Sequence, residues 1–338
     1  MTKWLQPFSW RSVCVAVLCV SFARGSHAAE IRRPSEDDLI RLTGEQLARG
    51  VGSMRWEVGN PPQSNLVIYS VEPRKYDSNR LTAIANHFGV KGEIQPIPPS
   101  FLPAPGYWVK QPNPTNHPWF KAVSFSEKSG RYSFAGDEDD HKWDLKNHKP
   151  LVRGVPTPEE ALARTLHLLP LFGISTNDLE HTPNGRLRWS YTTEGTTYKD
   201  RADGQRKRYI RRINLMLWQR VHEWASTLSI GGGGMFEASY ISEGKLAEVQ
   251  FLFRKMKPVA KAKSMTREEV LKSLKSGNAR SFQPSPETTL IVTNCTLVYP
   301  QHNGDHRQDF MWPFYEVRGC SIRDGETNSH SIYVPLKW

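Results

Sequence analysis

Residues 157–173 read TPEEALARTLHLLPLFG, and this stretch decides the expected fold because both ends of a helix are marked in it. Thr157 can cap the helix, proline occupies the first helical position, and Glu160 can reach back to complete a capping box. Apolar residues then recur at helical spacing until Gly173, which suits a helix end. The box returns in TREEVLKSLKSG at residues 266–277, so the sequence predicts two helices of the same kind.

A weaker helix signal occupies residues 77–89, and segments typical of strands follow each of the three helices. The strand-like segments are residues 120–126, 130–135, 186–193, 209–228, 235–240, 245–254, 289–299, 310–319 and 331–336. The helix starts are about 80 to 110 residues apart, which is too long for a solenoid and typical of duplicated small domains. We therefore expect an α+β protein of tandem units, each a helix packed on an antiparallel β-sheet.

The expected organisation has three parts. They are a signal peptide at residues 1–29, an N-terminal α+β unit at 30–150, and a tandem α+β region at 151–338 that divides into about 151–258 and 259–338. The N-terminal unit contains a proline-rich segment at residues 95–118. Prolines remove backbone donors, so we expect this segment to be a loop or an extended connector and not a regular element.

The first 29 residues carry the pattern of an export signal. A basic start with Lys3 and Arg11 leads into an apolar run at 13–22, and Ser26 and Ala28 supply a small-x-small cleavage site. This apolar run is too short for a retained membrane anchor, which needs about 20 residues. No later apolar run reaches the length of a transmembrane helix, so we expect a periplasmic or secreted chain without a membrane span.

The charge balance is moderately basic. Removal of the signal peptide takes away Lys3, Arg11 and Arg24 and reduces the net charge from +11 to +8. This excess of positive charge is compatible with an exported protein near anionic envelope surfaces and equally with a protein that binds nucleic acid. Because the chain is expected outside the cytoplasm, we expect no nucleic-acid partner.

Two cysteines, Cys295 and Cys320, remain after removal of the signal peptide. Both lie in strand-like segments that flank a polar loop, and an oxidising compartment allows such a pair to form a disulfide. The register of the strands decides whether the two Cα atoms come within about 7 Å. The alternative is two buried free thiols on neighbouring strands.

Two groups of residues are candidates for binding. A cationic patch with an interleaved aromatic consists of Arg206, Arg208, Tyr209 and Arg211. It can meet phosphates or an anionic polymer, although basic ends of hairpins are also common. Trp312 and Tyr315 lie in a strand-like segment. If their side chains are exposed, they can stack on sugars or peptides, and if they are buried, they form part of the core.

The sequence contains no strong catalytic or metal motif. His222-Glu223 lacks the second histidine of a zinc-protease helix, and the acidic loop at 136–141 lacks the features of an EF-hand. A polar loop contains further potential ligands, which are His302, Asp305, His306 and Asp309. A solvated loop explains them more simply. We therefore expect no catalytic residue, no metal and no cofactor.

The order of segments resembles the PepSY-like modules of bacterial exported proteins. The resemblance rests on TPEEA at 157–161, TREEV at 266–270 and PFYEV at 313–317. Strand-like segments at 185–193, 211–219, 232–240 and 244–253 complete the order. It implies a cystatin-like α+β fold and a peptidase-inhibiting or regulatory role, and similar tandem arrangements occur in extracytoplasmic regulators of sensor kinases. The chain departs from the family at residues 221–224, where VHEW replaces the usual Asp-Gly turn. The resemblance assigns no functional residue.

These observations favour an exported, non-enzymatic binding or regulatory protein that engages a peptide or an envelope protein through sheet edges, concave faces or the proline-rich loop. One alternative is an envelope enzyme that uses His302, Asp305 and His306, or His222 and Glu223, as acid–base groups. Another is a surface protein that adheres to an anionic polymer through the patch near Arg206, with strong salt dependence.

Overall fold

The computed structural model of the chain describes residues 53–63, 66–100, 105–111, 121–136, 143–144, 149–150, 154–200, 203–221, 225–230, 232–276, 279–281, 289–302, 308–323 and 325–336. The expected signal peptide lies outside these residues. So do the acidic residues 137–141 and the candidate acid–base residues His222, Glu223, Asp305 and His306.

The expected fold class, tandem units of one helix on one sheet, is wrong. The protein is mostly β-sheet, with about 50% strand and 18% helix. Its largest sheet has eight antiparallel strands, and strands that follow different helices pair with one another in it. The described residues contain three α-helices, as expected, but two of them pack on this one sheet and not on separate sheets.

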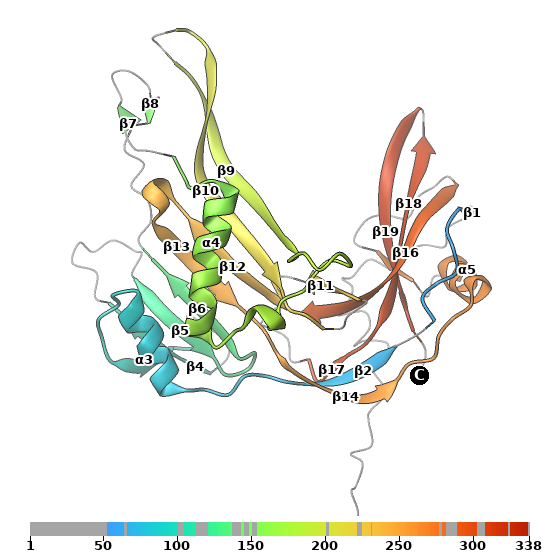
Figure 1. Cartoon of the computed structure of the whole chain (residues 1–338), viewed down its shortest axis with the longest axis horizontal. Coiled ribbons are helices and arrows are strands. Elements are labelled where there is room, and N and C mark those ends of the chain that lie inside the picture. The colour runs from blue at the N-terminus through green and yellow to red at the C-terminus, as the bar shows by residue number, and fades with distance from the viewer. Residues whose placement is uncertain are drawn as a thin grey trace, which may run out of the picture. The chain divides into compact units, whose positions relative to one another are not determined.

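The eight-stranded sheet combines strands from distant parts of the chain (Figure 1). In spatial order they are β3 (Ile94–Pro96), β4 (Gly106–Lys110), β5 (Ala122–Ser126), β6 (Arg131–Ala135), β13 (Leu246–Phe251), β12 (Met235–Tyr240), β10 (Arg206–Trp218) and β9 (Trp189–Lys199). Alternation makes the sheet two-sided: in β13, Ala247, Val249 and Phe251 are buried, while Glu248 and Gln250 point to the other face. Two helices, α3 (Ser78–His87) and α4 (Pro158–Leu168), cover the apolar face (Figure 1).

Capping boxes position two of the helices as the sequence indicates. In α4 (Pro158–Leu168) the Thr157 N–H donates to Glu160 Oε2 at 2.9 Å, and the Glu160 N–H donates to the Thr157 hydroxyl at 3.3 Å. In α5 (Arg267–Lys275) the corresponding distances between Thr266 and Glu269 are 2.8 and 3.2 Å. Asp77 caps the weaker helix, α3 (Ser78–His87), by accepting from the Arg80 N–H.

Aromatic side chains fill the space between the helices and the large sheet. Phe172, at the end of the 3-10 helix η1 (Leu169–Phe172), meets Phe251 edge-on with ring centroids 5.0 Å apart and Phe236 at 5.4 Å. Tyr132 stacks on Phe251 at 5.5 Å across the β6–β13 pair. All four side chains are almost completely buried, so this cluster is the centre of the core.

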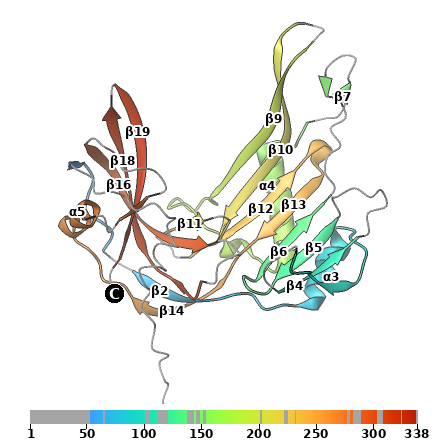
Figure 2. The ribbon, with the colours of Figure 1, turned by 180° about the vertical axis from the view of Figure 1, so that it is seen from behind.

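A second sheet contains the C-terminal strands (Figure 2). Its order is β1 (Met54–Trp56), β16 (Leu290–His302), β18 (Phe314–Arg323), β19 (Glu326–Pro335) and β15 (Arg280–Ser281), and β11 (Ser226–Ile230) also pairs with β16. Smaller sheets join β14 (Lys255–Lys261), β2 (Val67–Glu72) and β17 (Phe310–Met311), and pair β7 (Trp143–Asp144) with β8 (Lys149–Pro150). The remaining 3-10 turns are η2 (Thr176–Asp178) and η3 (Ser242–Gly244).

A buried polar network connects the ends of these sheets. The Gln219 side chain donates to the Arg254 carbonyl at 2.6 Å and accepts from the Arg254 N–H at 3.0 Å. The Arg254 guanidinium donates to Gln308 at 3.3 Å, and Thr227 of β11 donates to the Gln219 carbonyl. Burial lowers the pKa of Arg254 to about 10. These bonds satisfy polar groups that would be costly to bury alone.

The expectation that residues 95–118 contain no regular element is wrong. Strand β3 ends with Pro96, and β4 is a central strand formed by a stretch without proline. Pro96 is tolerated because β3 lies at the edge of the sheet, where a missing donor breaks no ladder bond on the open side.

None of the helices in the described part of the chain is long and apolar enough to cross a membrane.

We expect Gly130→Ala to destabilise the protein much more than Gly204→Ala. Both glycines have φ near +70°, so an alanine at either position costs about 1–3 kcal/mol of backbone strain. A Cβ at Gly130 would also lie 2.3 Å from the Arg74 nitrogen, while a Cβ at Gly204 would meet nothing within 4 Å. Urea unfolding should show an additional loss of about 2 kcal/mol for Gly130→Ala. Equal losses would mean that the segment at Arg74 moves aside freely.

Candidate functional site

The β9–β10 hairpin extends beyond the body of the eight-stranded sheet (Figure 1). Strand β12 pairs with β10 only from Ile213 to Trp218. The remaining part of β10 pairs with β9 alone. We call this part, residues 195–199 and 206–210, the distal hairpin.

A β-bulge determines how the distal hairpin presents its side chains. The register shifts between Ile210 and Arg212, which leaves Arg211 as an additional residue on β10. The partner strand has Gly195 at this point, and a Cβ there would lie 2.4 Å from the Tyr209 carbonyl oxygen. The glycine therefore allows the close approach of the two strands at the bulge.

One face of the distal hairpin carries unneutralised positive charge. Cross-strand pairs place Arg206 beside Lys199 and Arg208 beside Thr197, and these side chains are exposed. Arg208 Nη2 donates to Thr193 Oγ1 at 3.3 Å, so the guanidinium reaches from β10 to β9. No carboxylate of a described residue forms an ion pair with Lys199, Arg206 or Arg208. We call this surface the cationic face.

The opposite face of the distal hairpin is different in charge and burial. Lys207 contacts Asp200 at 2.6 Å and Asp203 at 2.7 Å, and its hydrogen bonds to these two carboxylates raise its pKa above the ordinary value. Tyr209 is buried on this side. The four candidate residues of the cationic patch are therefore not one site: Arg206 and Arg208 share a face, Tyr209 is on the other, and Arg211 occupies the bulge.

An exposed aromatic residue lies at the base of the cationic face. Tyr191 is 47% exposed, and its ring stacks on that of Trp189 with centroids 6.2 Å apart. Both belong to the alternate positions of β9 that also include Thr193 and Thr197. This face therefore changes from aromatic to cationic along one strand.

Strand β9 is also the longest strand at a sheet edge in the described structure. It has eleven residues, contains no proline, and pairs only with β10. Other edges are protected: β3 has three residues and Pro96, and β14 has a register shift, Pro258 and three lysines. Strand β19 is shorter than β9 and pairs with β15 only at Ile332 and Tyr333, so its residues 326–331 have no second partner strand in the described structure. Short length, prolines, lysines and bulges are the usual devices against pairing with another chain, and β9 has none along its middle.

The helix-free face of the large sheet is a polar network. Asn214 donates to Thr192 at 3.3 Å and to Glu194 at 3.1 Å, and it accepts from Ser239 at 2.7 Å. Burial raises the pKa of Glu248, and the nearby Glu237 raises it further, while Arg212 at 3.8 Å acts in the opposite direction. Within the described ranges, no group of three or more His, Cys, Asp or Glu residues is arranged to hold a metal.

Trp312 and Tyr315 belong to the core and not to an exposed surface. The Trp312 indole donates to the Leu336 carbonyl at 2.7 Å, and the Tyr315 hydroxyl donates to the Pro62 carbonyl at 2.6 Å. Both side chains are buried. The structure therefore does not bring these two residues together with Arg206 and Arg208. In the polar loop, His302 is buried, and its N–H donates to Gln308.

The two cysteines are free thiols on neighbouring strands. Cys295 of β16 lies opposite Val317, and Cys320 of β18 lies opposite Ile291, so the register separates them along the strands. The structure therefore contains two free thiols on neighbouring strands and no disulfide, and both residues are partly exposed, whereas the sequence-based alternative had them buried. Burial raises the pKa of the Cys295 thiol to about 12.

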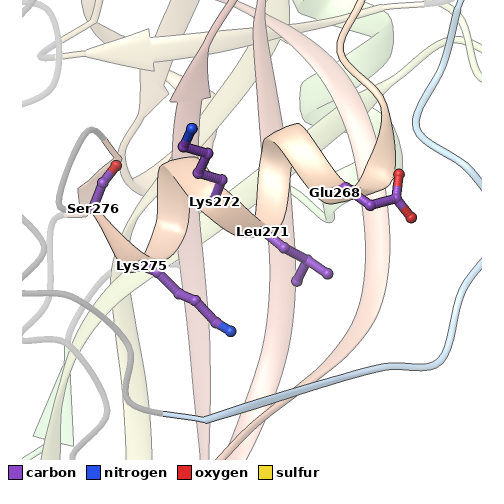
Figure 3. A pocket seen from close by; sticks show the side chains of 5 residues that line it. All are labelled: Glu268, Leu271, Lys272, Lys275 and Ser276. Carbon is purple, nitrogen blue, oxygen red and sulfur yellow. The ribbon is translucent and has the colours of Figure 1, made fainter.

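A hollow of about 430 Å³ lies on the surface of α5 (Figure 3). Its lining consists of Glu268, Leu271, Lys272, Lys275 and Ser276. Four of these residues belong to α5 and Ser276 is its C-cap, so the lining contains no residue of a second element. We therefore do not regard this hollow as the functional site.

The strand predicted at residues 186–193 overlaps β9, but its continuation to Lys199 beside the charges of the hairpin was not predicted. Residues 192–197 read TTEGTT, and they have the β-branched content of a strand without the alternating apolar residues of a buried one. This combination is the signal for an exposed edge, and it was available in the sequence.

Comparison with known proteins adds little to this geometry. No family model matches the chain, and no curated protein is significantly similar to it. Among solved structures, the chain is similar to an uncharacterized protein from Eubacterium rectale, with a TM-score of 0.42 and 8% identity, covering 79% of this chain and 82% of that one.

We expect the two thiols to differ in reactivity. In a reduced chain that begins at residue 30, Cys320 should react with a thiol reagent at pH 8 well before Cys295, because the pKa of Cys295 leaves almost no thiolate. Unfolding should make both accessible. A time course with Ellman's reagent, with and without denaturant, measures this. Equal rates in the folded protein would contradict the burial of Cys295.

We expect Glu248→Gln to stabilise the protein at neutral pH and not at acidic pH. The native carboxyl has a raised pKa, so the folded state binds its proton more tightly, and wild-type stability falls as pH rises through that pKa. The variant does not titrate at this position. Its advantage in thermal midpoint should therefore be present at pH 7 and disappear below about pH 4, where the unfolded carboxyl is also protonated. A difference that does not change with pH would contradict this account.

Proposed function

We propose that this chain is an exported, non-enzymatic binding protein that engages an extended polypeptide segment along the free side of β9. The observation that carries the proposal is the length and openness of this edge. Among the described residues, β9 has eleven residues and one partner strand, while the edges β3 and β14 carry protective residues. Export rests on the sequence of residues 1–29.

The binding mode is addition of a strand to the sheet. Along an edge strand, every second residue presents its N–H and C=O away from the sheet, and an incoming segment pairs with these groups. The backbone of β9 is held in an extended conformation by eleven register pairs with β10. The edge is therefore preorganised, which reduces the entropy lost on binding.

Backbone pairing alone gives weak binding. A segment of six residues forms about six hydrogen bonds, each worth about 0.5–1.5 kcal/mol net, whereas association costs at least about 4 kcal/mol. Contacts of side chains must therefore supply the remaining binding free energy. Tyr191 is available for this purpose because it is exposed and stacked on Trp189 at the base of the same face.

The proposal includes a regulatory role of the kind that the PepSY-like resemblance implies. A segment that lies in a sheet is shielded on its paired side and held extended, so it is no longer available to other proteins or to a peptidase. An envelope protein with an exposed flexible segment is the partner class that fits this mode.

Two neighbouring proline substitutions, Thr196→Pro and Thr197→Pro, test the edge. Successive N–H groups of β9 alternate between β10 and solvent, so one proline breaks the β9–β10 ladder and the other removes only an outward donor. Amide hydrogen exchange of β10 identifies which is which. We expect the variant with an intact ladder to lose a partner that the wild-type chain, residues 30–338, retains from envelope extract.

Thr196→Ala and Thr197→Ala are the matched controls, because they shorten the same side chains and keep the N–H groups. Both should retain the partner. If the proline variant with the intact ladder captures the same proteins as wild type, the edge of β9 is not the binding surface and the proposal is wrong.

A further inference from the structure

The charges of the distal hairpin are divided between its two faces. On one face, Lys207 is neutralised by Asp200 and Asp203. On the other, no described carboxylate forms an ion pair with Lys199, Arg206 or Arg208. Positive charge next to the free edge is therefore unneutralised on one side only.

The arginines are long enough to act at the edge itself. Arg208 belongs to β10, but its Nη2 lies 3.3 Å from Thr193 Oγ1 on β9, so the guanidinium already reaches the outer strand. An added strand would run about 4.7–4.9 Å beyond β9. A carboxylate on that strand can therefore meet the guanidinium with no change in the backbone of the hairpin.

The other face of β9 does not favour acidic residues. Glu194 points to that side and accepts a hydrogen bond from Asn214. Like charges that lie opposite each other across a strand pair are destabilising. An acidic side chain of the added strand is therefore favoured on the cationic face and disfavoured near Glu194.

We infer that the segment bound by β9 is a polypeptide with acidic side chains at every second position, on the face of Lys199, Arg206 and Arg208, and with uncharged residues between them. This inference rests on the proposed function and names the chemistry of its partner. Backbone pairing provides the position, and the cationic face provides the selectivity.

Three labelled ten-residue peptides test the inference with the chain 30–338. They alternate threonine with glutamate, glutamine or lysine, and fluorescence anisotropy measures their affinity at low and high salt. We expect the glutamate peptide to bind about tenfold more tightly than the glutamine peptide at low salt, because several exposed charge pairs contribute modestly. The advantage should shrink at high salt.

The variant Arg206→Glu/Arg208→Glu should reverse the preference and bind the lysine peptide best. The control Lys255→Glu/Lys261→Glu changes the net charge equally on β14 and should keep the wild-type preference. If the glutamate and glutamine peptides bind equally, the inference is wrong and the proposed edge binding stands. If none of the three peptides binds, both are wrong.

Dextran sulfate distinguishes a polypeptide from an anionic polymer. We expect the glutamate peptide to lose binding when the outward donor of β9 is replaced by proline, while any binding of dextran sulfate is unaffected. If the peptide also binds this proline variant as it binds wild type, the cationic face recognises charge without the edge, and the inference is overturned in favour of an anionic polymer.

Discussion

The pairing of β6 with β13 is the interaction on which the rest of the structure depends. It joins β3–β6 to β13, β12, β10 and β9, and without it the eight-stranded sheet would be two four-stranded pieces. The register brings Tyr132 opposite Phe251, and Phe172 then packs against this pair from the helical side. Four residue pairs between β6 and β13, which lie more than a hundred residues apart in the sequence, therefore determine the continuity of the sheet. They also determine the arrangement of the core and the position of η1.

Local features of the fold could be predicted from the sequence, and long-range pairings could not. The capping boxes at Thr157 and Thr266 act within four residues, so their helices begin where the sequence indicates. The partner of β6 depends on packing that no local pattern encodes, and for this reason the fold class was wrong. The candidate site could likewise be predicted only in part. The charges of Arg206 and Arg208 are visible in the sequence, but which face of the hairpin they occupy depends on a bulge.

The edge strands of the sheets differ in how well they are protected against pairing with another strand. Most edge strands in the described structure are too short, or carry too many lysines and prolines, to accept another strand. Strand β9 keeps its open side although exposed pairing groups are an aggregation risk. The cationic face reduces that risk for parallel pairing, because a second β9 would then bring Lys199 opposite its own copy.

The bulge at Arg211 gives one residue of chain length control over the chemistry of the whole hairpin face. Side chains alternate with a period of two, and the bulge absorbs the additional residue, so Arg206 and Arg208 point to the same side as Thr193. If the same residues alternated regularly without a bulge, Lys207 and Tyr209 would take the places of Arg206 and Arg208, and the surface beside β9 would become neutralised and aromatic. A related chain of the same length could thus change its preferred partner by pairing without the bulge, with every side chain of the hairpin conserved.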